Sequence, residues 1–281
     1  MVHSPETAAA ARVWFITGAS RGLGRAFTEA ALAAGDRVVG TARDVGPLED
    51  LAAGSDGRLV AFPLDVADRE AVMAGVRRAF DTFGRLDIVV NNAGQLLYGM
   101  LEEVTEDQAR AHMDTNFFGA LWVSQAVVPI LREQGSGHII QVGTVGAGGG
   151  FSCVGMYSAG KAALDAISEA LAMEVESFGI KVTKLQPTSY DTELFTTGTT
   201  ATDENPAYTG LRARLAELWS GANGPDPDPA QAAPVLMELV DLPDPPRRLA
   251  VGGYSYDLSL ESDRERTAEA ERWEALSRKG G

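Results

Sequence analysis

The amino-acid sequence predicts an α/β fold in which helices cover both faces of a doubly wound, mostly parallel sheet of seven strands. Short runs rich in β-branched residues alternate with longer helical patterns through the first two-thirds of the chain, which is typical of parallel strands joined by crossover helices. Most of these runs lack polar alternation, as strands buried on both faces should. The 281 residues show no internal repeat and no second core, so a single domain is expected.

Seven segments have the composition of buried strands. They are Val13–Thr17, Arg37–Thr41, Leu59–Leu64, Leu86–Asn91, His138–Val142, Lys181–Gln186 and Arg248–Val251. Helical patterns lie between them, at Gly22–Ala34, Arg69–Phe83, Glu106–Arg132 and Ser158–Ser177, the third of which need not be continuous.

The pattern changes in residues 188–228. The first part, up to Tyr208, is rich in Thr, Ser and small residues and is expected to form a mobile excursion. A helix is expected at Leu211–Trp219, and Asp228 should cap the helix that follows. From about Ser259 a charged helical pattern runs to the end of the chain.

The composition argues against several classes of partner. A net charge of −15 opposes binding to nucleic acid or to an anionic membrane, since both need a basic surface. No apolar run reaches the roughly 18 residues of a membrane span, and no signal-peptide pattern is present. The single cysteine, Cys153, excludes an internal disulfide and fits a cytoplasmic location. The three histidines lack ligand spacing, so no metal site is expected.

A glycine-rich loop follows the first predicted strand and opens the first predicted helix. It reads Thr17-Gly-Ala-Ser-Arg-Gly-Leu-Gly24. Gly18, Gly22 and Gly24 would let the backbone turn tightly and approach a pyrophosphate at the free N–H groups of the helix N-terminus. A plain turn is the alternative, but the position between strand and helix favours a dinucleotide site.

Tyr157 and Lys161 are four residues apart and project from the same face of a predicted helix. A phenol titrates at about 10 and becomes an acid–base catalyst near neutral pH only beside a cation, which Lys161 could supply. An exposed Tyr–Lys pair is the alternative, and the spacing alone does not decide between them.

Taken together, five motifs resemble those of the short-chain dehydrogenase/reductase family, whose fold is Rossmann-like. They are Thr17–Gly24, Leu64-Asp65-Val66, Asn91-Asn-Ala-Gly94, Asn116 in Asp114-Thr-Asn-Phe117, and Tyr157 with Lys161, between Arg12 and about Val251. The resemblance implies that Tyr157 is the general acid/base, that Lys161 lowers its pKa and bonds the nicotinamide ribose, and that Asn116 holds a water of a proton relay. It also implies that Asp65 touches the adenine.

The cofactor site that this resemblance implies runs through residues 12–187 and into the next loop. Its expected members are Gly18, Ser20, Arg21, Gly22, Leu23, Gly24, Arg43, Asp65, Val66, Asn92, Ala93, Gly94, Tyr157, Lys161, Pro187, Thr188 and Thr192. Residues 188–228 would form a substrate loop or lid, and residues 259–281 a C-terminal helical tail.

Charges near the second strand favour NADP(H) over NAD(H). NAD-specific members place an acid at the end of this strand, whereas here it ends Gly40-Thr-Ala-Arg43, and Arg21 sits inside the glycine loop. Two guanidiniums converging on one point would suit a 2′-phosphate. Two solvated arginines are the alternative, and Asp44 is a competing partner for Arg43.

The chain departs from the family pattern at two places. The catalytic serine, usually in a Ser-Ser pair, corresponds here to Thr144 after Gly143, and Thr188 replaces a glycine after the sixth strand. Thr144 keeps a hydroxyl for the substrate oxygen, although its β-methyl restricts χ1. We therefore expect a ketoreductase or alcohol dehydrogenase, with two alternatives. One is a repurposed member that dehydrates, isomerises or cyclises with Tyr157 as base, and the other is a dinucleotide sensor without turnover.

The substrate pocket is expected to form from Gln95–Tyr98, Val145–Met156 and Thr188–Tyr208. These segments offer apolar contacts, so a medium-sized, largely apolar carbonyl or alcohol should fit, and Cys153 should serve packing. The segment Asn116–Leu131 is apolar nearly all round, which predicts a homodimer or homotetramer.

Overall fold

Seven parallel strands form the central sheet, in the order β3-β2-β1-β4-β6-β7-β9. The computed structural model describes residues 11–149, 151–222 and 225–280; Gly150, in an expected pocket segment, and both ends of the expected domain lie outside them. The strands are β1 (Val13–Thr17), β2 (Arg37–Ala42), β3 (Leu59–Pro63), β4 (Ile88–Asn91), β6 (Gly137–Val142), β7 (Ile180–Pro187) and β9 (Arg248–Val251). Every neighbouring pair is parallel, so the predicted doubly wound fold is confirmed and the sheet is fully parallel.

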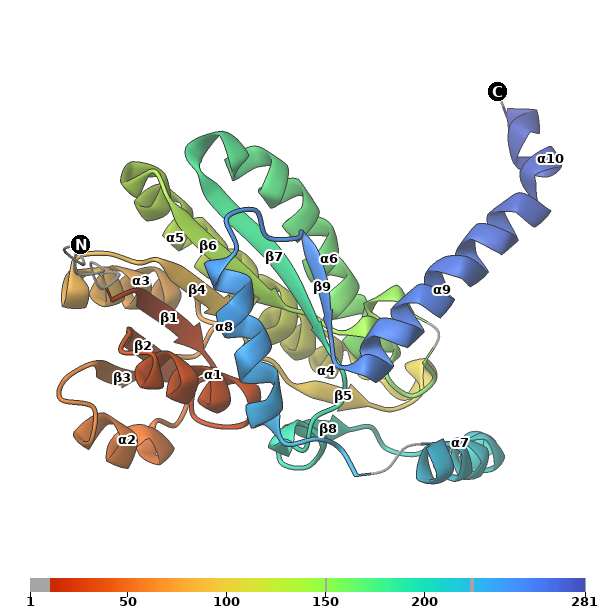
Figure 1. Cartoon of the computed structure of the whole chain (residues 1–281). Coiled ribbons are helices and arrows are strands. Elements are labelled where there is room, and N and C mark those ends of the chain that lie inside the picture. The colour runs from red at the N-terminus through yellow and green to blue at the C-terminus, as the bar shows by residue number, and fades with distance from the viewer. Residues whose placement is uncertain (1–10, 150, 223–224, 281) are drawn as a thin grey trace, which may run out of the picture.

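Helices cover both faces of this sheet (Figure 1). Helices α1 (Gly22–Ala33) and α8 (Ala233–Asp241) pack on one face, and α3 (Arg69–Phe83), α5 (Gly119–Gln134) and α6 (Gly155–Val175) pack on the other. Successive side chains of β1 alternate between the two cores: Trp14 belongs to the first and Phe15 to the second, and both are fully buried. Burying such a side chain contributes about 1.5–3 kcal/mol, which explains why the strands carry no polar alternation.

The order of strands reverses at β1, whose neighbours are β2 on one side and β4 on the other. Chain connections therefore leave β1 and β4 in opposite directions, and a crevice opens beyond their carboxyl ends. Ligands of open α/β sheets bind in such a crevice.

The helix expected over residues 106–132 is interrupted, as the sequence allowed. Helix α4 (Glu106–Met113) leads into one π-helical turn, Asp114–Phe118, and then into α5. A π turn widens the helix locally and occurs often at functional sites. Here it carries Asn116.

Several elements were not predicted. A small parallel sheet joins β5 (Leu96–Tyr98) to β8 (Thr199–Ala201), and a short helix α2 (Glu49–Ala53) precedes β3. Three-residue strands are too short to show a period in the sequence, so their pairing depends on the tertiary structure. The helix expected at Leu211–Trp219 is present as α7 (Thr209–Ala222), and because β8 lies within residues 188–208, that part of the segment is more structured than expected. The cap at Asp228 is confirmed, since its carboxylate accepts the N–H of Ala230 at 2.8 Å.

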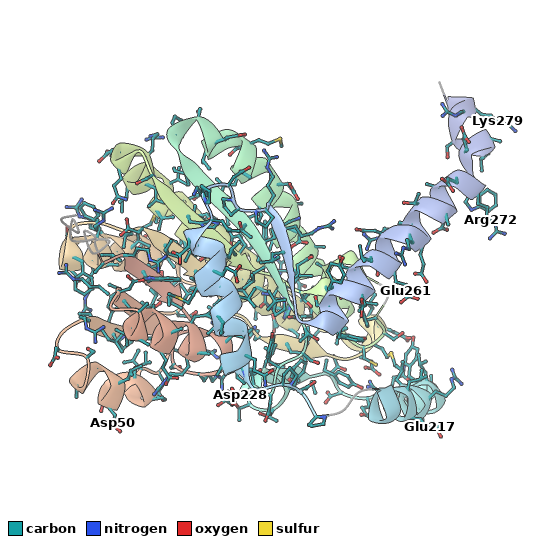
Figure 2. The ribbon with its side chains drawn as sticks, viewed as in Figure 1. Asp50, Glu217, Asp228, Glu261, Arg272 and Lys279 are labelled. Atoms are coloured by element: carbon teal, nitrogen blue, oxygen red, sulfur yellow. The ribbon has the colours of Figure 1, made fainter. Side chains whose placement is uncertain are left out.

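The C-terminal tail begins earlier than expected. Helix α9 (Gly253–Arg272) starts at Gly253 rather than near Ser259 and is followed by α10 (Glu274–Ser277). Helix α9 projects away from the sheet (Figure 1). The exposed side chains of Glu261 and Arg272 on α9, and of Lys279 after α10, are labelled in Figure 2. The first two turns of α9, which carry Tyr254 and Leu258, reach the site described next.

Candidate active site

A cavity of about 690 Å³ opens at the carboxyl edge of the sheet. Nearly all the residues expected to bind the cofactor or the reacting groups line it. They are Gly18, Ser20, Arg21, Gly22, Leu23, Arg43, Asp65, Val66, Asn92, Ala93, Gly94, Thr144, Tyr157, Lys161, Pro187, Thr188 and Thr192. The two exceptions, Gly24 and Asn116, do not line the cavity but contact lining residues: Gly24 packs against Gly18, and Asn116 bonds Gln95.

The glycine loop has the geometry of a phosphate cradle. Gly18 and Gly22 have φ of +65° and +52°, a region that favours glycine, and a Cβ at Gly24 would collide with the carbonyl oxygen of Gly18. The side-chain amide of Asn92 donates to the same oxygen at 3.0 Å, which ties the loop to the end of β4. No acidic residue occupies the first turn of α1. These residues therefore fit the pyrophosphate of a dinucleotide.

Lys161 is buried at the base of the cavity, with 4% of its surface exposed. Its Nζ donates to the carbonyl oxygen of Val142 at 2.7 Å and lies 6.0 Å from the centre of the Tyr157 ring. Burial lowers the pKa of Lys161 to about 8, against the opposing charge of Asp165.

Tyr157 differs electrostatically from the expectation. Burial raises its pKa to about 12, and the hydrogen bond with Thr144 opposes this only in part. Lys161 does not contribute to this pKa; its ammonium bonds the Val142 carbonyl and lies 6.0 Å from the centre of the Tyr157 ring. The phenol is therefore protonated at neutral pH, as a proton donor must be.

Asn116 connects the π turn to the segment after β4. Its Oδ1 accepts the N–H of Gln95 at 3.0 Å, and its Nδ2 donates to the Gln95 carbonyl at 2.9 Å. A Cβ at Gly94 would stand 2.8 Å from Oδ1, so only glycine allows this approach without displacement. The neighbouring His112 is neutral, because burial and then the charge of Lys161 lower its pKa to about 4.

The two arginines do not converge as expected. Arg21 donates from Nη1 to the hydroxyl of Thr197, 2.7 Å away in the segment after β7. Arg43 lines the cavity and has no hydrogen bond or ion pair with any residue that the structure describes. Asp44 does not pair with it, since its Oδ1 accepts the N–H of Gly46 at 2.9 Å. The sequence places both arginines near the cofactor loop, but the direction of Arg21 depends on a segment far along the chain.

The segment after β7 closes the cavity from the other side. Thr188 donates its N–H to the carbonyl of Val251 at 2.9 Å, and its methyl group lies 2.9 Å from where a Cβ of Gly252 would stand. Gly252 has φ of +97°. The missing glycine at position 188 is thus matched by a glycine across from it.

Apolar side chains from the segments expected to form the substrate pocket line the cavity. Contributors include Leu96, Phe151, Val154, Leu194 and Phe195, as expected from the sequence, and also Tyr254 and Leu258 of α9. The last two were missed; their signal is the four-residue spacing directly after the last strand. Cys153 is buried behind this wall, with Sγ 3.8 Å from the sulfur of Met100, which agrees with a packing role.

The described residues contain no group of three or more His, Cys, Asp or Glu side chains that could hold a metal ion. None of their helices is both long and apolar enough to cross a membrane.

Comparisons with known proteins agree with this geometry. Residues 12–203 match the family model described as short chain dehydrogenase. The chain is 36% identical over 269 residues to an oxidoreductase of Botryotinia fuckeliana, covering 95% of this chain and 98% of the relative. It is 32% identical to a 3-ketodihydrosphingosine reductase of Bacteroides thetaiotaomicron, covering 86% and 88%.

Solved structures show the same similarity. A short-chain dehydrogenase of Streptomyces avermitilis superimposes with a TM-score of 0.90 at 39% identity, covering 98% of this chain and all of the other. A 3-ketoacyl-(acyl-carrier-protein) reductase of Brucella melitensis complexed with NADH gives 0.74 at 26% identity, covering 87% and 98%.

Proposed function

The chain belongs to the short-chain dehydrogenase family, and from this premise we propose that it is an NADP(H)-dependent reductase or alcohol dehydrogenase for a medium-sized, largely apolar carbonyl or alcohol. Membership of this family shows that the protein is an NAD(P)-dependent oxidoreductase acting on CH–OH or C=O groups. The proposal of a carbonyl reductase or alcohol dehydrogenase is supported above all by one observation: Thr144, Tyr157 and Lys161 line the same cavity as the glycine loop.

The chemistry assigned to these side chains is proton transfer at the substrate oxygen. Thr144 and Tyr157 interact through their hydroxyls, so a carbonyl oxygen placed between them would accept a hydrogen bond from each. The phenol proton passes to that oxygen. Lys161 would stabilise the phenolate that remains after its ammonium leaves the Val142 carbonyl, since in this structure it does not lower the pKa of Tyr157. NADPH, when bound, would supply the hydride that reduces the carbonyl carbon.

Preference for NADP(H) is supported by charge. Arg43 at the end of β2 lines the cavity, has no ionic partner within the described part of the chain, and stands where NAD-specific proteins carry an acid. A guanidinium can bind a 2′-phosphate through two parallel hydrogen bonds. Arg21 would join it after leaving Thr197.

A ketone is the preferred substrate class because apolar side chains such as Phe151, Leu194 and Tyr254 line the cavity, and among the described residues Arg21, Arg43 and Lys161 are its only basic lining residues. Two of the similar proteins are named as reductases of 3-keto compounds, which supports the same class.

The test is a panel of apolar ketones and aldehydes, followed at the NADPH absorbance band with product analysis. We expect one NADPH oxidised for each alcohol formed. Product formed without net NADPH oxidation would instead support dehydration, isomerisation or cyclisation. NADPH binding without turnover on any compound would support a sensor.

We also propose that the protein acts in the cytoplasm as a homodimer or homotetramer. The π turn and helix α5 leave Phe117, Phe118 and Trp122 half-buried, and a second copy would cover the surface of these rings that remains exposed. Sedimentation at micromolar concentration should give a multiple of 29.7 kDa, and a monomer would contradict the proposal.

A further inference from the structure

Helix α6 carries a third ionisable residue in line with its tyrosine and lysine. Tyr157, Lys161 and Asp165 follow one another at four-residue intervals, so they occupy one face of the helix. The side chain of Asp165 is 19% exposed and lies beside Lys184 and Gln186 of β7 and beside Gly143, the residue that follows β6.

The two oxygens of Asp165 have different surroundings. Oδ2 accepts the side-chain amide of Gln186 at 3.3 Å and lies 3.8 Å from Nζ of Lys184. Oδ1 is buried and has no hydrogen-bond partner among the described residues. A Cβ added at Gly143 would stand 3.2 Å from it. A buried oxygen without a donor costs free energy, so this carboxylate is not explained by stability.

Asp165 is coupled to the reacting groups by two routes. The first is electrostatic: Lys161 is buried beside a neutral carbonyl, and Asp165 is the anion that opposes the effect of burial on the pKa of Lys161. The second is geometric, since the same amide nitrogen of Gln186 donates to Asp165 and, at 3.4 Å, to the main-chain carbonyl of Thr144.

We propose that Asp165 is a positioning residue of the active site, whose carboxylate keeps Lys161 in its charged form and, through Gln186, holds the backbone that carries Thr144. Its meaning for catalysis rests on the proposed function. Its effect on Lys161 does not, because that effect is a property of the folded protein alone.

Three cations and one further carboxylate influence the pKa of Asp165. Lys161 and Glu169 face it from α6, Lys184 from β7 and Arg248 from β9. Burial raises the pKa of Asp165 above its usual value, and the three cations oppose this rise only in part. Glu169 provides a matched control: it lies one turn further along α6, pairs with the same Lys184 at 2.8 Å, and does not contribute to the pKa of Lys161.

The deciding experiment is an NMR titration of the lysine side chains. The chain has four lysines, Lys161, Lys181, Lys184 and Lys279, so protein labelled with ¹³C at the lysine ε-carbon gives few signals, and Lys161→Arg identifies the one of interest. We expect Asp165→Asn to move the Lys161 titration to lower pH and Glu169→Gln to leave it in place. An unmoved Lys161 titration in Asp165→Asn would overturn the proposal.

Two additions keep the test decisive. If Asp165→Asn does not fold, Asp165→Ser is the second neutral variant, and Asp165→Glu, which retains the charge, should titrate like the wild type. Where a ketone substrate has been found, the alkaline fall in kcat should also move to lower pH in the neutral variant, with NADPH affinity unchanged. A protein that reduces no carbonyl compound contradicts the proposed function, while the titration still decides the role of Asp165.

Discussion

The carboxylate of Glu103 and the guanidinium of Arg212 form an ion pair, with Oε2 2.5 Å from Nη2, that joins the segment before α4 to helix α7. The two side chains are 2% and 12% exposed. Glu103 also accepts the hydroxyl of Thr202 and the N–H of Asn205, each at 2.8 Å. The carboxylate of Glu103 thus anchors residues 202–212, which follow the cavity-lining segment 187–197 in the chain.

Replacing Glu103 should loosen this segment. Burial would raise the pKa of Glu103, but its bonds with Arg212, Asn205, Met100 and Thr202 outweigh burial and lower the pKa to about 2. The carboxylate interactions are therefore complete above the unfolded value of about 4.5 and are lost as the pH falls through about 2.

At neutral pH we expect Glu103→Gln to raise KM for the ketone and to speed tryptic cleavage near α7, with NADPH affinity unchanged. Glu204→Gln is the control, since Glu204 is 3.9 Å from Arg212 and 71% exposed. Equal effects of the two variants would show that the loss of a negative charge near Arg212, and not the loss of the Glu103 hydrogen bonds, raises KM and speeds cleavage.

Tyr157→Phe should nearly abolish turnover and leave NADPH affinity roughly intact, because general acid–base catalysis contributes typically 10²–10⁴-fold. Thr144→Ala should also lower kcat severely, since a donor to the developing oxyanion is worth about 2.7–4 kcal/mol. Thr144→Ser should be tolerated or faster. Steady-state rates decide, and a normal rate for Thr144→Ala with an inactive Tyr157→Phe would favour the repurposed chemistry.

Arg43→Ala should weaken NADPH binding at least tenfold while leaving NADH binding nearly unchanged, because a charge-assisted bond is worth about 1.5–3 kcal/mol. Fluorescence titration with both cofactors measures this. Arg37→Ala is the matched control, as it lies at the opposite end of the same strand. Equal weakening of NADPH and NADH would assign Arg43 a structural role.

Gly143→Ser should stabilise the fold relative to Gly143→Ala. Both add a Cβ 3.2 Å from the unpartnered Oδ1 of Asp165, but only serine adds a hydroxyl that can donate to it. The expected difference in unfolding free energy is about 0.5–1.5 kcal/mol, measured by denaturant titration. A serine variant no more stable than the alanine variant would show that the hydroxyl does not reach the oxygen.

Stability should fall as the pH is lowered from 7 toward 4, with His138 contributing. Burial and then the charge of Lys181 lower its pKa to about 4. Thr183 donates to Pro246, so Nε2 of His138 must donate to Thr183 at 2.9 Å, and the unprotonated Nδ1 is buried without a partner among the described residues.

The pKa of His138 in the folded protein is below its unfolded value of 6.5. The contribution of neutral His138 to the free energy of unfolding is therefore complete above pH 6.5 and is lost as the pH falls toward 4, by up to roughly 3 kcal/mol. His138→Gln should flatten this part of the Tm profile. An unchanged slope would exclude His138 as a cause.

The sequence by itself determined the features that depend on neighbouring residues. Buried strands such as Val13–Thr17 show as unbroken apolar runs, the glycine loop shows as spacing between a strand and a helix, and the common face of Tyr157 and Lys161 follows from helical geometry. Each of these depends on the backbone within a few residues. The fold class and nearly all of the cavity lining could therefore be predicted.

Only the tertiary structure decided contacts between distant segments. Arg21 meets Thr197, Glu103 meets Arg212, and Asp165 meets Gly143. These contacts depend on how helices and loops pack across the sheet, and periodicity within one element does not encode that packing. The pKa of Tyr157 is the clearest case: the four-residue spacing predicts a neighbouring cation that lowers this pKa, but burial raises it and the hydrogen bond with Thr144 opposes the rise only in part.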